Sequence, residues 1–189
     1  DVAIAIEEGG NATGAALSDA SVTAGAAASG IDGGGDSDTI DNRGDIELLA
    51  NSDATGVAVS LTVAGTMQGD AEGAAASDAS VAARSTAVGI DGGAGDDTID
   101  NAGAIILMNG VGDDEIDARA TAVSVGLTVT GTMDGNVEGE AISDSSAFAE
   151  AAATGIDGGA GDDDIDNEGA ILADVTADAT GVGVGASVG

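Results

Sequence analysis

The sequence contains no cysteine, histidine, proline, tryptophan, tyrosine or lysine, and Phe148 is its only aromatic residue. Without cysteine and histidine, the chain cannot build a disulfide framework, an imidazole base, a thiol nucleophile or the usual zinc and haem ligand sets. Its 35 acidic residues are opposed by only 3 arginines, which leaves a net charge of −32 over 189 residues. Such a polyanion cannot neutralise phosphates, so we exclude nucleic acid as a partner and direct adhesion to an anionic membrane surface.

Long hydrophobic runs are also missing, so we expect no segment to insert into a membrane. The sequence opens at Asp1 without a charged and apolar leader, and we expect any signal peptide to be absent or already removed. Hydrophobic residues nevertheless make up 43% of the chain, too many for a disordered acidic tail. Most of them are alanine and valine, and 33 residues are glycine. Such small side chains predict a thin core and an elongated architecture in which backbone ladders provide much of the order.

The sequence repeats itself about three times. Residues 30–42 return at 89–101 and again at 155–167, with spacings of 59 and 66 residues. A fixed period of this kind indicates a repeat architecture. We interpret the chain as a single array, residues 1–189, with units 1–29 (partial), 30–88, 89–154 and 155–189 (partial). The array starts and stops in mid-unit without capping repeats, so we expect either a longer array or end-to-end self-association.

Within each unit, side-chain size alternates with a period of two, which predicts β-strands with one face inside and one in solvent. One strand has small residues that we expect inside (Val81, Ala83, Ser85 and Ala87) and variable ones outside (Ala82, Arg84, Thr86 and Val88). A second has apolar residues that we expect inside (Val57, Val59, Leu61 and Val63) and Ala58, Ser60 and Thr62 outside. A third follows each Asn-x-Gly turn, at 46–48, 105–107 and 171–173, where the turn asparagine is expected to bond its own backbone.

The predicted fold class is therefore all-β, a parallel β-solenoid (β-helix or β-roll) built from about three repeats of 59–66 residues. We expect each repeat to fold into two or three coils of roughly 20–30 residues, stacked at about 4.8 Å. An antiparallel β-sandwich is the alternative, but it would not require a sixty-residue repeat.

Acidic glycine-rich turns are the candidate binding sites of this sequence. Residues 92–100 (GGAGDDTID) and 158–166 (GGAGDDDID) fit the pattern Gly-Gly-x-Gly-x-Asp-x-apolar-x. Residues 33–41 depart from it at Asp36, and residues 109–117 are a fourth near-match. This nonapeptide resembles that of the repeats-in-toxin (RTX) family of secreted bacterial proteins. The resemblance implies Ca²⁺ held between turns by Asp carboxylates and backbone carbonyls.

Carried over to this sequence, the resemblance implies three groups of metal-binding residues. The motif's ligating aspartates are Asp38, Asp97, Asp114 and Asp163; their acidic neighbours are Asp36, Asp96, Asp113 and Asp162; and Asp32, Asp91 and Asp157 close the cage. The chemistry is suitable, because Ca²⁺ takes six to eight oxygen ligands and adjacent carboxylates repel unless a cation lies between them. Family members stack their nonapeptides in tandem, however, whereas three of these four stand alone. The alternative interpretation is that Asp and Gly simply form solvated turns.

We therefore expect a structural protein, a calcium-stabilised bacterial solenoid at the cell surface or outside the cell, forming an adhesin stalk or filament by coil-on-coil stacking. Alternatives are a ligand-binding solenoid module for carbohydrate or ice, or the RTX segment of a larger secreted enzyme or toxin. We expect no catalytic residues, because an acidic pattern repeated without specialisation is poor evidence for one catalytic pair.

Overall fold

The computed structural model describes residues 1–107 and 116–188, and every regular element in these ranges is a β-strand. No helix capable of spanning a membrane occurs in this described part. The strands fall into long and short classes. The long class comprises β2 (Ala12–Asp32), β5 (Asn51–Thr66), β6 (Ala71–Asp91), β9 (Ile116–Thr132), β10 (Val137–Asp157) and β13 (Val175–Val188). The short class comprises β1 (Val2–Glu7), β3 (Thr39–Asn42), β4 (Ile46–Glu47), β7 (Thr98–Asn101), β8 (Ile105–Leu107), β11 (Asp164–Asn167) and β12 (Ile171–Ala173).

Each sheet takes one strand from each repeat, and all strand pairs are parallel. The sheet orders are β1-β5-β9-β13, β2-β6-β10, β3-β7-β11 and β4-β8-β12. Equivalent positions lie side by side, so that Val22 pairs with Val81, which pairs with Ala147. The predictions of an all-β fold and of parallel strands are confirmed.

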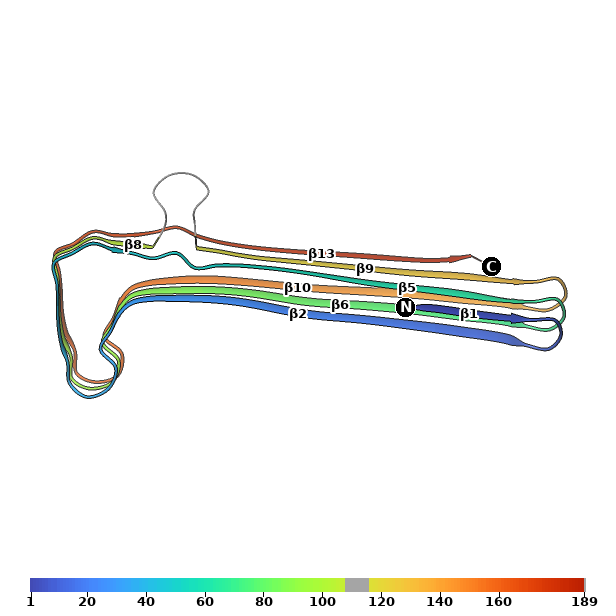
Figure 1. Ribbon diagram of the computed structural model, residues 1–189, viewed down its shortest axis with the longest axis horizontal. Helices are drawn as coiled ribbons and strands as arrows, with labels where there is room; N and C mark the ends of the chain where they lie inside the picture. Colours follow the sequence, from blue (N-terminus) through green and yellow to red (C-terminus); the bar gives the residue numbers. More distant parts are fainter. Residues whose placement is uncertain (108–115, 189) are drawn as a thin grey trace.

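One repeat makes one circuit of the chain, so the prediction of two or three coils per repeat is wrong. A circuit runs through β2, β3, β4 and β5 before β6 returns beside β2 (Figure 1). The reason is the length of the strands, which is 21 residues in β2 and 16 in β5. The two-residue alternation continues through these stretches, and turn-forming clusters of Gly, Asn and Asp occur only at their ends.

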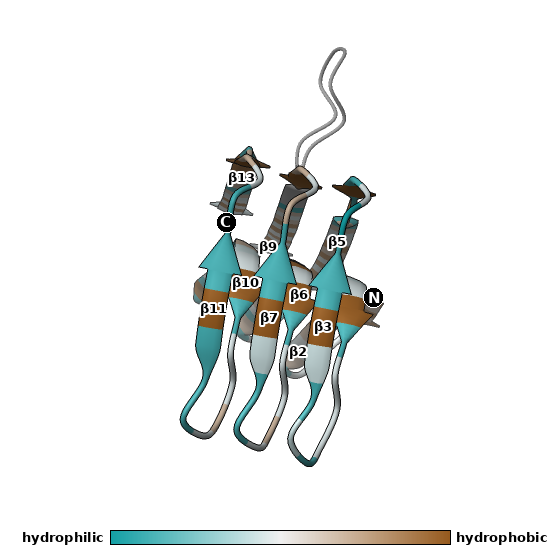
Figure 2. Ribbon diagram, turned by 90° about the vertical axis from the view of Figure 1, so that its left-hand side faces the viewer, coloured by the Kyte–Doolittle hydropathy of each residue, from teal (hydrophilic) through white to brown (hydrophobic). Residues whose placement is uncertain are grey.

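The long strands form two facing layers, with β2, β6 and β10 on one side and β5, β9 and β13 on the other (Figure 1). At one end the chain bends into a hook. Here β3, β7 and β11 connect the acidic turns to the opposite layer (Figure 2).

The interior between the two long layers is thin and lined with small side chains. Buried alanines such as Ala58, Ala79 and Ala83 alternate with hydroxyl pairs that bridge the layers. The Oγ atoms of Ser60 and Ser77 lie 2.7 Å apart. The same contact joins Ser52 to Ser85 and Ser124 to Ser145, at 2.9 Å in each case. The layers approach so closely that a Cβ added at Gly56 would lie 2.6 Å from Cγ2 of Val81.

The orientation predicted for the second strand is wrong. Val57 and Val59 of β5 are 58% and 49% exposed, whereas Ser60 and Thr62 on the alternate face are fully buried. The thin interior has no room for a rank of valine and leucine side chains. It accepts serine and threonine because they find partners there, as when the Thr62 hydroxyl donates to the Ala74 carbonyl at 2.6 Å. The alternation predicted for β6 is confirmed, with Val81, Ala83, Ser85 and Ala87 all buried.

Larger apolar side chains are buried where the chain bends. They form a cluster that comprises Ile40, Ile90, Ile99, Ile105 and Leu107. Ile40, Ile99 and Ile165 occupy equivalent positions and form the hydrophobic band across β3, β7 and β11 (Figure 2). This cluster supports the turns that carry the acidic motif.

The thin interior generates a stability prediction. Ser77→Leu forces a large side chain between the layers and removes the hydroxyl that donates to the Val125 carbonyl, so it should reduce the free energy of unfolding by about 1–3 kcal/mol. Ser80 lies on the exposed face of the same strand, and Ser80→Leu should change the free energy by less than about 0.5 kcal/mol. Urea denaturation followed by circular dichroism measures both. Equal losses in the two variants would contradict the assignment of faces.

Candidate functional site

The acidic turns of the three circuits stack on one another at the hook. Residues 33–38, 92–97 and 158–163 are equivalent, and Ala94 is bridged to both Gly35 and Ala160. Gly34, Gly93 and Gly159 have φ angles of 92°, 94° and 87°, in the left-handed region that favours glycine. Asp36 adopts a φ of 75° where the other two circuits have glycine. Aspartate tolerates this conformation better than most residues, so the departure of the first motif does not break the turn.

The structure brings Asp38, Asp97 and Asp163, three of the aspartates predicted as ligands, into one column. Oδ1 of Asp97 accepts a hydrogen bond from the backbone N–H of Asp38 at 2.7 Å, and Oδ1 of Asp163 accepts one from the backbone N–H of Asp97 at 3.0 Å. Asp97 is almost completely buried, at 1% exposure. One oxygen of each accepting carboxylate therefore serves to join neighbouring circuits.

Two aspartates of the column each have one oxygen without a partner. Oδ2 of Asp38 and Oδ2 of Asp97 are buried without a hydrogen-bond partner. They point towards the glycine pair of their own turn, where a Cβ at Gly92 would lie 2.8 Å from Oδ2 of Asp97. Buried carboxylate oxygens without donors are costly, and here charges of one sign share a column. A bound cation would relieve both problems.

The other predicted ligands act mainly as turn-forming groups. Oδ1 of Asp91 accepts from the Gly93 N–H, and Oδ1 of Asp157 accepts from the Gly159 N–H, both at 3.0 Å. Asp32 is exposed at the equivalent position. Oδ1 of Asp96 accepts from the Asp162 N–H of the next circuit at 3.0 Å.

The donor chemistry fits calcium, but the carboxylates alone do not complete a site. In residues 1–107 and 116–188, no three acidic side chains converge as a metal-binding group. A calcium ion at the aspartate column would need backbone carbonyls and water to reach six to eight ligands. Asp113 and Asp114 of the fourth near-match lie outside the described residues.

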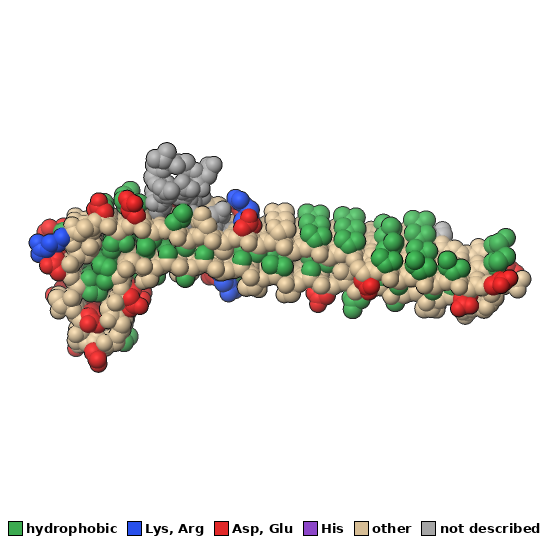
Figure 3. Space-filling model, in the orientation of Figure 1, with side chains coloured by type: hydrophobic (Ala, Val, Ile, Leu, Met, Phe, Trp, Pro, Cys, Tyr) green, Lys and Arg blue, Asp and Glu red, His purple; other side chains and the backbone are tan. Residues whose placement is uncertain are grey.

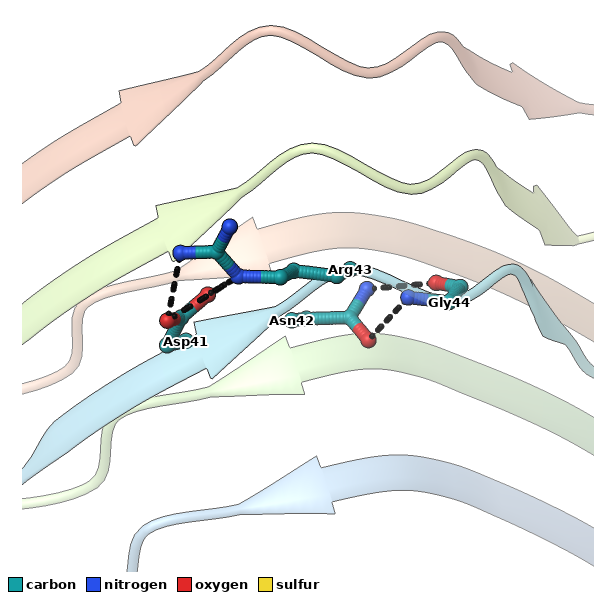
Figure 4. A network of polar contacts seen from close by, with 4 residues as sticks. All are labelled: Asp41, Asn42, Arg43 and Gly44. Carbon is teal, nitrogen blue, oxygen red and sulfur yellow. Dashed lines mark hydrogen bonds and ion pairs between the residues drawn. The ribbon is translucent and has the colours of Figure 1, made fainter.

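An asparagine ladder runs across the last residues of β3, β7 and β11, at the other end of these strands from the aspartate column. Nδ2 of Asn42 donates to Oδ1 of Asn101 at 2.6 Å, and Nδ2 of Asn101 donates to Oδ1 of Asn167 at 2.6 Å. Each amide also donates to the carbonyl two residues on, as Asn42 does to Gly44 (Figure 4). The predicted bond within each turn is confirmed. The bonds between circuits were missed, although the recurrence of asparagine at one repeat position was a usable signal.

Side-chain oxygens accept hydrogen bonds from backbone N–H groups of the neighbouring circuit at several other places in this chain. At the opposite end of the long strands, Oδ1 of Asn11 accepts from the Asp70 N–H, and Oδ1 of Asp70 accepts from the Asn136 N–H. At the hook, Oδ1 of Asp45 accepts from the Ala104 N–H. Many of the acidic and amide turn residues therefore hold adjacent circuits together.

Arg43 forms an exposed ion pair with Asp41 beside this ladder (Figure 4). Nε and Nη2 of the guanidinium donate to Oδ1 and Oδ2 of Asp41, both at 2.9 Å. These hydrogen bonds hold the pKa of Asp41 below its ordinary value of 3.8; desolvation opposes this lowering, and the charge of Arg43 makes a smaller contribution to it.

No protein-family model, curated protein or solved structure matches the chain. The geometry described above is therefore the basis for any functional assignment.

The asparagine ladder predicts a position-dependent loss of stability. Asn101→Ala removes bonds to both neighbouring circuits at a fully buried position, so it should reduce the free energy of unfolding by about 1–3 kcal/mol. Asn167 is exposed at the end of the ladder, and Asn167→Ala should cost less than half as much. Thermal and urea unfolding compare the two variants, and equal costs would argue against a cooperative ladder.

The Asp41–Arg43 pair predicts a pH effect with a definite sign. Because the folded state lowers the pKa of Asp41, the pair contributes stability above the ordinary value of 3.8, and this contribution is lost as pH falls through the lowered pKa. Carboxyl-detected NMR titration should find the pKa of Asp41 below 3.8, and Arg43→Gln should raise it towards that value. An unchanged pKa in the variant would show that the pair does not form in solution.

Proposed function

We propose that this chain is a structural β-solenoid segment of a bacterial cell-surface or secreted protein, serving as an adhesin stalk or filament. The observation that carries the proposal is the in-register parallel pairing of equivalent residues in successive repeats. Each circuit offers the next one the same backbone ladder and the same side-chain columns. A stack of this kind extends by adding circuits, which makes it suited to spanning distance.

Growth along the stack would use strand edges. β2 and β10 form the two edges of their sheet, and β1 and β13 those of the other long sheet. An edge strand is a template for pairing with a further strand, from the same chain or from another copy. Further repeats of a longer array and coil-on-coil association of copies use the same geometry.

A non-catalytic role is favoured by how the acidic residues are distributed. Equivalent turns carry equivalent aspartates in each circuit, as with Asp38, Asp97 and Asp163, and each accepting carboxylate has a bond to its neighbour. A catalytic pair requires two carboxyl groups in different environments at one place. The repetition instead supports a structural use of the carboxylates.

Calcium stabilisation is part of the proposal, and its motivation is electrostatic. Register pairing places Asp78 beside both Asp19 and Asp144, and Asp91 beside both Asp32 and Asp157. Two unit charges about 4.8 Å apart repel by roughly 0.9 kcal/mol even in water, and many such pairs accumulate in a chain of charge −32. Cations that bind only the folded state would offset this repulsion, each contributing about 1.4 kcal/mol at tenfold saturation.

The aspartate column, with Asp97 buried at its centre, is the proposed principal site. Its orphaned Oδ2 atoms on Asp38 and Asp97 supply hard oxygen donors, and the RTX-like turn supplies carbonyls. The mechanism is charge compensation, in which the folded stack is disfavoured where calcium is scarce and stabilised where calcium is plentiful. This behaviour suits a protein that must reach the outside of the cell before it becomes rigid.

A single isosteric substitution tests the calcium site, because its effect on stability relative to the unmodified chain should differ between chelator and calcium. Asp97→Asn keeps the Oδ1 acceptor for the Asp38 N–H and removes a buried charge, so in chelator it should be at least as stable as the unmodified chain. With millimolar Ca²⁺ the unmodified chain should gain thermal stability, whereas Asp97→Asn should lose roughly 1.4 kcal/mol of that gain for one site lost at tenfold saturation.

The control is Asp78→Asn, which removes one exposed charge from the same circuit away from the turns. Calcium should stabilise this variant as it does the unmodified chain, and Mg²⁺ should stabilise all three chains less. Differential scanning calorimetry with and without chelator provides the readout. If calcium stabilises none of them, or Asp97→Asn responds like the control, the aspartates are turn-forming groups only.

A further inference from the structure

The outer face of the β1-β5-β9-β13 sheet is apolar over most of its length. We call it the valine face, and its side chains are exposed or half-buried in spite of their hydrophobicity, with Val57 at 58% and Ile4 at 67% exposure. They stand in stacked rows along the long arm of the molecule (Figure 3). The rows are Val57/Val123/Val182, Val59/Val125/Val184, Val2/Leu61/Leu127/Ala186, Ile4/Val63/Val129/Val188 and Ile6/Gly65/Gly131.

Charge is confined to the boundaries of the valine face. The row Asp53/Arg119/Asp178 lies before it, and Glu7 and Glu8 follow Ile6 at its other end. The outer face of the opposite long sheet, by contrast, carries an aspartate column and several glutamates, among them Asp78, Asp144 and Glu138. The two faces of one thin molecule therefore differ sharply in polarity. An exposed apolar surface of this extent marks an interaction site.

We infer that the valine face binds the valine face of a second copy of this chain. Two polyanions of charge −32 repel each other, and an uncharged face allows close approach at the lowest electrostatic cost. A lipid surface is a poorer partner, because the acidic boundaries would meet anionic headgroups. Face-to-face packing of sheets about 10 Å apart is a standard way to bury such a surface. The inference goes beyond the proposed function, since it concerns lateral pairing and not growth along the stack.

The area approaches that of a specific interface. The valine face takes nine residues each from β5 and β9, seven from β13 (residues 182–188) and five from β1 (residues 2–6). At about 3.3 Å per residue and about 4.8 Å per strand, these cover about 475 Å² per copy. The pair buries about 950 Å² in total, close to the roughly 1,000 Å² that a specific interface should clear. Each additional circuit would add about 145 Å² per copy. Longer arrays would therefore pair more tightly than short ones.

The valine face has a ridge at one end and a groove at the other, and this shape favours a dimer in which the strands of one copy run antiparallel to those of its partner. Gly65 and Gly131 lie in a groove of about 510 Å³ whose apolar lining includes Ile6, Val63, Met67, Val129 and Met133, with Glu7 at the boundary of the face. A two-fold axis along the stacking direction, through the row of Leu61 and Leu127, places the Val57 ridge of one copy over this groove of the other. A parallel arrangement, with the two-fold axis along β9, would set groove on groove and bring Asp53 of one copy against Asp178 of the other. The antiparallel arrangement also leaves both stacks extending in the same direction.

Matched charge insertions test the inference. Sedimentation equilibrium in about 1 M salt, where repulsion is screened to about 3 Å, should find the unmodified chain paired. The double variant Val59→Asp/Val125→Asp should weaken pairing roughly 100-fold or more, because unpaired charges would be buried. The control Leu17→Asp/Ile142→Asp adds the same charge at exposed apolar positions of the opposite sheet, 68% and 53% exposed, and should pair like the unmodified chain. Circular dichroism verifies that every variant folds.

Cysteine cross-linking tests the geometry, since the chain contains no cysteine of its own. Leu127→Cys lies on the proposed two-fold axis and should form a disulfide-linked dimer on mild oxidation, whereas Leu17→Cys should not. If copies also stack end to end, the valine-face variant should still form single stacks, so failure of lateral pairing is distinguishable from failure of stacking. A chain that stays monomeric, equal weakening by both double variants, or equal cross-linking of both cysteines would overturn the inference. So would a monomer that sediments with vesicles of neutral phosphatidylcholine, which would identify lipid as the occupant.

Discussion

The rest of the structure depends on parallel, in-register pairing between repeats. Once β6 lies beside β2 with an offset of 59 residues, each side chain is placed next to its own counterpart in the following circuit. Each contact between equivalent side chains is therefore repeated at every step from one circuit to the next. Alanine columns pack closely, and asparagine columns gain an amide–amide bond at each step, as between Asn42 and Asn101. Aspartate columns accumulate repulsion. The amino-acid composition of the chain is best understood as a response to this constraint.

The chain accommodates its acidic columns in different ways. On the outer face of β6, Asp78 and its counterparts remain in water, where repulsion is weakest. In the turns, carboxylates such as Asp96 and Asp163 accept backbone N–H groups from adjacent circuits, so that a repelling residue also forms a connection. Arginine is used once in each of three columns. Arg43 pairs within its own circuit, whereas Arg84 and Arg119 reach acidic residues of the neighbouring circuit. None of these interactions supplies a partner for the buried Oδ2 atom of Asp97.

Sequence reasoning succeeded where the repeat itself carries the information and failed where partners come from the facing layer. The repeat predicted parallel pairing, and the alternation in β6 predicted its faces. The register was not predicted, because coils of roughly 20–30 residues were expected where pairing occurs at the full offsets of 59 and 66 residues. For β5 the same reasoning chose the wrong face, because hydropathy ranks Val57 as more buried than Ser60. Ser60 is buried because Ser77 lies opposite it, and no pattern within β5 reveals that contact. Residues 92–97 were predicted as a turn, but the pattern within one turn does not reveal that Asp97 accepts a hydrogen bond from the neighbouring circuit.

The inverted faces of β5 and the thin interior have one cause. Two long layers joined by serine and alanine can approach closely, but they bury little apolar surface, and the hydrophobic contribution scales with that surface. Larger apolar side chains are buried only at the hook, around Ile99 and Ile105. The valines and leucines excluded from the interior are then left on the outside, in rows as regular as the register that places them. A fold of this kind satisfies its backbone within the stack and leaves much of its hydrophobic surface available for contacts beyond it. Its stability should therefore depend on how many circuits and faces are brought together, more than on the content of any single circuit.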